Sequence, residues 1–455
     1  MDTQISNESL PKSMRYGMSS ATAVPATSVL SRFASVNGSS FTPNGSNQIR
    51  FKVQAPGFLD VSKHFLEFTV TTATATAFVD GDAGSFFDRL RIESNGAVVE
   101  EILSHGLYNN IRNTYSDLND IGKLSVQSGA GQQSILSSAA AAGTVLSVQK
   151  GSLGINFTAG HSKTFCIQFH SGLLKNTHGK ALPDGTAELD IILTLAGNNQ
   201  ALIGVTATAP TYSISSPTLF CPSYKIENAM VMNEYRQMMM SRGVQISGQS
   251  VKTYINTLLN GTGTKSLQIN DRSLSLLGLV TAVRPAAADS TINIYSNSSY
   301  GFTTTDDTTQ INRYHYQIGG TNYPQSDVNI SVAPNGLNLG RVHEETLKAL
   351  SKPGEGYAKS SVNVSQLTKE IDGVYASATA TNSLEAPKGL LSVDLKSFDM
   401  DKLKMVGLNT SLNSGPSVLE VDVGVTMGSN TQATTYALVE SIYTVLPNGM
   451  ISVAQ

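Results

Sequence analysis

The residues that could do chemistry in this 455-residue chain are few and scattered. The seven histidines, at positions 64, 105, 161, 170, 178, 315 and 343, include no HxH or HxxxH pair and no Cys/His combination at metal-ligand spacing. Protein zinc sites usually draw their ligands from such closely spaced groups. His161, His170 and His178 fall in one strand-and-loop region, but the pattern predicts no metal site there, and His315 is interpreted as an ordinary strand residue.

Pairs of carboxylates could serve glycoside hydrolysis, which uses two acids flanking the scissile bond. Glu188/Asp190 and Glu420/Asp422 each place both acids on one face of a strand at i and i+2. Because the pair occurs in both halves of the chain, a solvated strand face explains it better than an active site. The neighbouring Glu100-Glu101 is interpreted as surface charge near a turn.

No GxSxG and no Walker-type loop occurs in the sequence. Together with the scattered histidines and the repeated acid pairs, this predicts no catalytic, cofactor-binding or metal-ligating residue. The chain is therefore expected not to be an enzyme and to need no cofactor.

A hairpin pattern at 310–330 organises the second half of the chain. Residues 311–318 alternate in the manner of a half-buried strand. Gly319-Gly320 follows and suits a type I′ turn, where both central residues need a positive φ. The strand resumes through Tyr323, and Pro324 is predicted to end it because proline has no N–H for the ladder.

The first half holds a similar hairpin at 87–99, with Asn95-Gly96 in the turn. Arg89 precedes its turn by six residues, as Arg313 precedes its own, an offset of 313 − 89 = 224. A helix is predicted after each hairpin, one N-capped by Ser104 with apolar residues at 107, 111, 115 and 118, and one over 341–351.

Later strands repeat as well. The acid pairs lie 420 − 188 = 232 apart, and Tyr212 and Tyr436 are again 224 apart. Four matches in the same order at nearly constant spacing predict a duplicated domain, with one long irregular β protein as the alternative. The many short strands indicate an all-β sandwich or jelly roll in each half.

The chain is predicted to have three parts. Residues 1–47 are rich in Ser, Asn and Gly, show no lasting hydrophobic period, and are predicted to be an N-terminal arm that orders only against a partner, or a plain tail. Residues 48–220 and 221–455 are predicted to be the two β domains. A short helix at 233–242 leads into the second.

Composition narrows the classes of function. Charged residues make up 14% of the chain, which fits loop-rich β domains or surfaces covered by copies of the same chain. The net charge of −3 gives no footprint for nucleic acid or an anionic membrane. Cys166 and Cys221 are predicted to be buried free thiols. Residues 1–19 show no secretory signal and 274–283 are too short to span a bilayer, so a soluble protein that matures in a reducing cytoplasm is expected.

Two short motifs carry a resemblance to a known family. The hairpin from Arg313 to Pro324, RYHYQIGGTNYP, and the ending from Ile442 to Ile451, IYTVLPNGMI, resemble parts of double jelly-roll major capsid proteins of icosahedral DNA viruses. The relatives are of the adenovirus-type lineage, including polinton-like and large DNA viruses. The resemblance covers about residues 48–455 and implies two tandem eight-stranded jelly rolls with short helices after the central hairpins.

The resemblance also implies a function. It predicts homotrimers that form pseudo-hexameric capsomers of an icosahedral shell, often over an internal membrane, with minor capsid and penton proteins as partners and no sequence-specific nucleic-acid binding. The protein would be assembled inside the host cell and reside in the virion. The alternatives are a tandem β-sandwich carbohydrate-binding protein or adhesin, and a carbohydrate-active enzyme on a jelly roll. The absence of a signal sequence weighs against the first, and the absence of tryptophan against the second.

Overall fold

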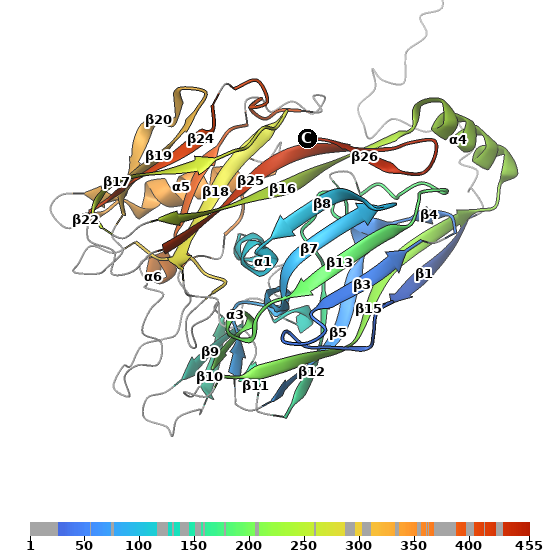
Figure 1. Cartoon of the computed structure of the whole chain (residues 1–455), viewed down its shortest axis with the longest axis horizontal. Coiled ribbons are helices and arrows are strands. Elements are labelled where there is room, and N and C mark those ends of the chain that lie inside the picture. Colours follow the sequence, from blue (N-terminus) through green and yellow to red (C-terminus); the bar gives the residue numbers. More distant parts are fainter. Residues whose placement is uncertain are drawn as a thin grey trace, which may run out of the picture.

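The computed structural model describes residues 26–455, except for 55, 74–76, 116–125, 130–131, 137–144, 151–155, 158–159, 177–178, 205–208, 259–260, 287–295, 303–310, 333–335, 353–355, 361, 363, 368–387, 397–404, 414 and 425–430. Leu118 and His178, which the sequence analysis singled out, lie outside the described residues. The described part is predominantly β, and Figure 1 shows it as two β sandwiches side by side.

The first sandwich consists of two antiparallel sheets of four principal strands each. One sheet has the order β1 (Ala26–Ala34), β15 (Thr211–Ile226), β5 (Phe65–Ala73) and β12 (Ser162–Ile167), and the short strands β2 (Ser40–Phe41) and β4 (Phe58–Leu59) also pair with β15. The other has the order β3 (Gln48–Val53), β13 (Leu189–Leu195), β7 (Phe87–Ser94) and β8 (Ala97–Leu103). In β3 the apolar Ile49, Phe51 and Val53 alternate with exposed polar residues and enter the core.

The second sandwich repeats this order strand for strand. One sheet is β16 (Val244–Leu258), β25 (Thr431–Val445), β18 (Leu276–Pro285) and β23 (Leu390–Asp394), with β26 (Ile451–Ala454) added to β25. The other is β17 (Gly263–Ile269), β24 (Ser417–Val423), β19 (Ile311–Ile318) and β20 (Thr321–Asn329). Taken in chain order, the eight strands of each half occupy the same places, which confirms the predicted pair of tandem eight-stranded jelly rolls.

Shorter elements decorate the two sandwiches. The remaining strands are β6 (Ala77–Val79), β9 (Gln132–Leu136), β10 (Val145–Lys150), β11 (Asn156–Phe157), β14 (Leu202–Gly204), β21 (Ser331–Val332) and β22 (Gly336–Leu337). The helices are α1 (His105–Thr114), α3 (Asn198–Ala201), α4 (Ala229–Arg242), α5 (Leu339–Leu350) and α6 (Val364–Leu367), with 3-10 turns at Val61–Lys63 and Ala83–Phe86. Helix α4 joins β15 to β16 and begins four residues before the helix predicted at this linker.

Both central hairpins have the predicted turns. Asn95 and Gly96 have φ angles of 49° and 82°, and Gly319 and Gly320 have 58° and 83°, as a type I′ turn requires. The prediction that Pro324 ends the return strand is wrong, since β20 continues to Asn329. Strand β20 is the last strand of its sheet, and its pairing is irregular at Pro324: Tyr323 pairs with Tyr316, and pairing resumes only at Val328 with Tyr314. The proline therefore needs no N–H for the ladder there.

The turn at Gly320 gives a direct test of the second hairpin. We expect Gly320→Val to destabilise the protein by about 2 kcal/mol, because a β-branched side chain would be forced to positive φ. Chemical denaturation would measure the loss. Thr321→Val, one residue further on and inside β20, is the matched control and should be neutral; equal stability of the two variants would contradict the turn assignment.

The duplicated arginines lie at matching places. Arg89 on β7 pairs with Glu101 on β8, and Arg313 on β19 pairs with Asp327 on β20 at 3.1 Å. The acid pairs are not equivalent in this way. The residue two positions before the turn pairs with Asp190 in the first sandwich and with Val418 in the second. Equivalent positions on these strands are therefore 418 − 190 = 228 residues apart rather than 232.

The helices after the hairpins also form, with one correction. In α1, Leu107 and Ile111 are buried as predicted, but Ser104 has φ 48° and its side chain makes no cap hydrogen bond. Helix α5 is capped by Asn338, whose Oδ1 accepts from the N–H of Arg341. The Glu344–Lys348 ion pair on α5 measures 3.3 Å.

The structure corrects the interpretation of the N-terminal region. Ala26–Ala34 is β1, which pairs along its whole length with β15 of the same chain, so this segment does not wait for a partner to become ordered. Its pairing partner β15 runs on to Ile226, past the boundary predicted at 220. Sequence patterning missed β1 because its residues 26–30 are exposed on both faces and show no period of two.

Candidate assembly site: the junction of the two sandwiches

The two sandwiches have the same orientation, so that corresponding ends lie next to each other. Connections between successive strands alternate between the two ends of a sandwich, so the Asn95-Gly96 turn lies at the opposite end from Ala83–Phe86, α1 and α3, and the Gly319-Gly320 turn lies opposite residues 296–302 and α5. We call these the turn end and the insertion end. The insertion ends meet, since Asn297 donates from its backbone N–H to Asp80 and from Nδ2 to the Gln200 carbonyl.

The turn ends of the two sandwiches meet as well. The N–H of Ala187 donates to the Gly449 carbonyl at 2.8 Å, and the N–H of Ile451 donates to Ser94 Oγ at 3.2 Å. Long strands β16 and β25 reach across from the second sandwich towards α4 beside the first (Figure 1). Helices α1 and α3 of the first sandwich and α5 of the second therefore lie towards one common end of the molecule.

Glu100 is the central polar contact of the junction. It lies on β8 of the first sandwich, is 3% exposed, and accepts from the N–H of Gly172 at 2.9 Å. Its carboxylate also accepts from Ser250 Oγ on β16 at 2.8 Å and from the Tyr443 hydroxyl on β25 at 3.4 Å. Ser171 Oγ at 2.5 Å and the N–H of Leu173 at 3.3 Å complete the set. One carboxylate thus ties a loop of the first sandwich to two strands of the second.

The interpretation of Glu100-Glu101 as surface charge is wrong for Glu100. The ladder between β7 and β8 contains a β-bulge opposite Ile92 and Glu93, so that Val99 and Glu100 are both buried. A bulge inserts one residue and turns the following side chains to the other face. The sequence carries no signal of this bulge, and the position of Glu100 near a turn is therefore interpreted as exposed.

The backbones of the two sandwiches also touch next to Glu100. A Cβ atom built on Gly248 of β16 would lie 1.9 Å from the Gly172 carbonyl oxygen, and one built on Gly172 would lie 2.4 Å from the Tyr443 hydroxyl. Glycine is required where two backbones approach this closely. The loop at 171–173 is therefore held against β16 both by contact and by hydrogen bonds.

Buried charges line the insertion end of the junction. Asp80 and Asp82 of the first sandwich are attracted electrostatically by Lys388 of the second, and all three side chains are nearly inaccessible to solvent. Loss of hydration raises the pKa of Asp80 and lowers the pKa of Lys388, while their mutual attraction opposes both shifts. Asp82 is held by the N–H of Gly84 and by Asn109 Nδ2.

Helix α1 fills the middle of the junction. Tyr108 of α1 packs against Tyr436 of β25 with ring centroids 5.2 Å apart, and the Tyr436 hydroxyl donates to the Ser104 carbonyl at 2.9 Å. Arg112 donates to the Leu350 carbonyl at the end of α5. Side chains of both sandwiches form one continuous apolar cluster across this interface, as in an obligate rather than a transient contact.

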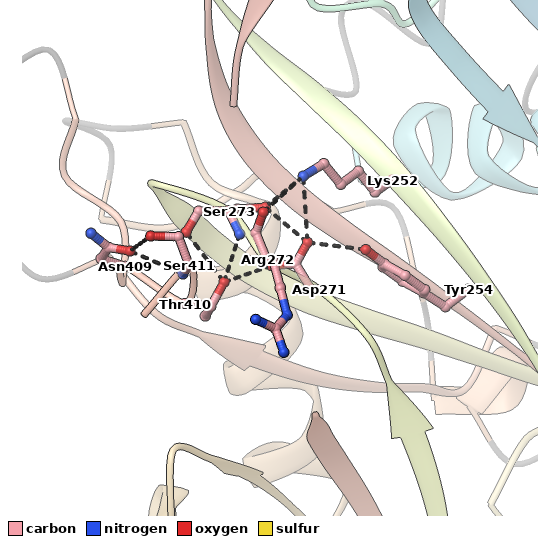
Figure 2. Close-up of polar contacts among 8 residues, drawn as sticks. All are labelled: Lys252, Tyr254, Asp271, Arg272, Ser273, Asn409, Thr410 and Ser411. Atoms are coloured by element: carbon pink, nitrogen blue, oxygen red, sulfur yellow. Dashed lines mark hydrogen bonds and ion pairs between the residues drawn. The ribbon is translucent and has the colours of Figure 1, made fainter. Parts of the chain in front are cut away.

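A second polar network stabilises the turn end of the second sandwich. Figure 2 shows Asp271, between β17 and β18, accepting from Tyr254 at 3.1 Å, Ser273 at 2.8 Å and Thr410 at 3.0 Å. Lys252 Nζ lies 3.8 Å from the same carboxylate. The network ties β16 and the loops preceding β18 and β24 into one unit, and its closed set of partners indicates support for the fold rather than a catalytic role.

The acid pairs singled out in the sequence lie on outward strand faces. Asp190 pairs with Arg50 at 2.6 Å and Glu188 with Lys52 at 2.5 Å, and the hydrogen bond from Arg50 holds the pKa of Asp190 below its usual value. Glu420 lies 3.4 Å from His315, which also contacts Asp327 at 3.2 Å. Asp422 lies 3.5 Å from Arg313, so each acid has a basic partner on a neighbouring strand. The expectation of a solvated face does not hold for Asp190, which is only 8% exposed.

The remaining candidates are separate from one another. Cys166 and Cys221 are free as predicted, but only Cys221 is buried, and Cys166 is partly exposed. Burial raises the pKa of the Cys221 thiol to about 12. Among the residues that the structure describes, no three His, Cys, Asp or Glu side chains gather as a metal site would require. Within the same residues, every helix is too short or too polar to cross a membrane.

Buried histidines are the titratable feature that sequence spacing missed. His64, His105 and His170 surround Phe169, with the first two rings centred 5.7 Å and 5.6 Å from it. His64 Nε2 accepts from the N–H of Phe169, His170 contacts Asn113, and both ring nitrogens of His105 lack a partner. Burial lowers the pKa of His64 and of His105 to about 4.

These histidines predict a loss of stability in acid. The unfolded chain protonates each histidine below about pH 6.5, whereas the folded chain does so only near pH 4, so their contribution falls as pH drops through this interval, by up to about 3 kcal/mol each. We expect His105→Phe to flatten the dependence of the unfolding free energy on pH between 6.5 and 4. Exposed His161→Phe is the control, and identical slopes for wild type and His105→Phe would contradict the prediction.

The strand order and the common orientation of the two sandwiches define a double jelly-roll protein. No protein-family model and no curated protein sequence matches the chain. Solved structures do. The Faustovirus major capsid protein is similar over 96% of this chain and 92% of its own, with a TM-score of 0.59 and 10% identity.

Two further solved structures are also similar. The mavirus major capsid protein matches with a TM-score of 0.54 and 11% identity, covering 100% of this chain and 95% of its own. A chain in the structure of the Sputnik virophage matches with a TM-score of 0.56 and 14% identity, covering 98% of this chain and 92% of that one. At such identities the likeness establishes the fold, and the double jelly roll suggested by the sequence motifs is confirmed.

Proposed function

We propose that this chain is the major capsid protein of an icosahedral virus. The observation that carries the proposal is the repetition of one eight-stranded order in two sandwiches that stand in the same sense and are joined by a buried junction. Major capsid proteins of Faustovirus and mavirus have this fold over nearly their whole length.

The geometry suits a capsomer of three chains. Two nearly equivalent sandwiches in one rigid chain allow a trimer with true three-fold symmetry to present six similar walls, and such a body tiles a shell as a hexagon does. The insertion ends would face outward together. The turn ends, with α4, would face minor capsid and penton proteins or an internal membrane.

Several further points belong to the same proposal. The protein would work without catalysis or a cofactor, be assembled inside the host cell and reside in the virion. With a net charge of −3 it would not bind nucleic acid sequence-specifically. We place the first jelly roll at 26–226 and the second at 244–454, instead of the predicted division at 47 and 220.

Light scattering behind a sizing column tests the proposal. The expected species has three times the chain mass of 48.2 kDa, and electron microscopy at higher protein concentration should show hexagonal capsomers. A monomer at every concentration that binds glycans on an array would favour the tandem β-sandwich adhesin instead.

A further inference from the structure

The two sandwiches differ in how their matching sheets are covered. In the second sandwich, β18 is buried at every residue and β23 at all but its last. The outer side of the sheet that contains β18 and β23 is covered by two helices. Tyr108 of α1, from the first sandwich, packs against Tyr436, and Ala349 of α5 lies against Gly278. The matching strands β5 and β12 of the first sandwich bury only alternate residues. Within the part of the chain that the structure describes, one copy of the sheet is therefore covered and the other is open.

The open face carries a compact apolar patch near its turn end. Phe65 of β5 stacks on Phe220 of β15, with centroids 4.8 Å apart and an interplanar angle of 14°. Leu30 of β1 is 52% exposed and lies opposite Pro222, two residues from Phe220. We call these four side chains the docking patch. They share one side of the sheet because directly paired residues, and residues two apart, point the same way.

The composition of the patch and its surroundings is that of a protein contact. Leu219, Cys221 and Leu66 on the opposite side already fill the core, so the docking patch contributes nothing to it. Arg32 lies opposite Phe220 at the rim, and Glu67, two residues after Phe65, lies on the same side with Cys166 opposite it. Further along the face, Thr69 is bonded to Thr164 and Thr71 to Ser162. Aromatic residues with a polar rim are typical of interface hot spots.

We propose that the docking patch binds a second copy of this chain, which covers this sheet as the junction covers the matching sheet within one chain. The inference rests on the proposed function and adds the surface through which the trimer forms. The junction joins unlike surfaces of the two sandwiches, and a contact built in the same way between chains closes into a ring rather than a two-fold dimer.

The experiment compares the full-length chain with a double variant, Phe65→Ser together with Phe220→Ser. Sedimentation or light scattering across a dilution series should give wild-type trimers and a variant whose self-association is about 100-fold weaker. Leu412→Ser, which removes an 85%-exposed side chain in the second sandwich, is the matched control and should form trimers like the wild type.

A measurement on the wild type alone guards against misfolding of the variant. Amide hydrogen exchange of residues 65–71 and 218–224 should slow in the trimer relative to the diluted monomer. A wild-type trimer whose exchange there is unchanged, or whose double variant associates equally well, overturns the docking patch and leaves the capsid role intact. A wild-type chain that forms only monomers or dimers, or whose patch binds lipid vesicles instead of itself, overturns both.

Discussion

Glu100→Ala should cost about 3 kcal/mol of unfolding free energy and separate the unfolding of the two sandwiches. The substitution leaves the N–H groups of Gly172 and Leu173 buried without an acceptor, and a buried unsatisfied donor costs about 1–3 kcal/mol. The hydroxyls of Ser250 and Tyr443 lose the same partner. In calorimetry, the variant should show two unfolding transitions where the wild type shows one.

Glu101→Ala is the matched control for that variant. Glu101 is the next residue on β8, but its carboxylate is one-third exposed and pairs with Arg89 on the sheet surface. Exposed ion pairs contribute about 0–1 kcal/mol, so this variant should unfold almost like the wild type. If Glu100→Ala were equally harmless, the carboxylate would not hold the sandwiches together.

Gly248→Val should have an even larger effect on the junction. The new Cβ would lie 1.9 Å from the carbonyl oxygen of Gly172, and that obstacle is backbone, which cannot rotate away as a flexible side chain could. Either the loop at 171–173 or β16 must move, and the hydrogen bonds of Glu100 would be lost with it. We expect at least about 3 kcal/mol of destabilisation, or insoluble protein.

Gly340→Ala controls for the loss of a glycine as such. Gly340 lies in the first turn of α5, and a Cβ there would meet no atom within 4 Å. Alanine also favours helix over glycine, so this variant should be neutral or slightly more stable. Limited proteolysis together with chemical denaturation would compare the two, and a normally stable, protease-resistant Gly248→Val protein would show that the sandwiches do not touch at this point.

Local chemistry made much of the fold predictable. Gly319-Gly320 and Asn95-Gly96 could be placed in turns because few other residues accept positive φ at two successive positions. The alternation of Ile49, Phe51 and Val53 identified a half-buried strand. The duplication followed from spacing alone, although the acid pairs that supported it proved to be four residues out of register.

The candidate site could not be predicted in the same way. Strand β1 has no amphipathic period, and only its partner β15, almost 200 residues later in the chain, makes it part of a sheet. In the sequence Glu100 cannot be distinguished from its neighbour Glu101, and only the β-bulge in β8 directs its side chain into the junction. His64, His105 and His170 are far apart in the chain and meet only around Phe169.

The sequence by itself thus determined that the chain is all-β, that it contains two copies of one design, and where its tight turns lie, because these depend on residues within a few positions of one another. Only the tertiary structure decided which faces are buried, that the two copies have the same orientation, and which sheet of the described residues remains uncovered. Burial and register depend on contacts between strands that are far apart in the chain, and a local sequence pattern does not show which strands will pair.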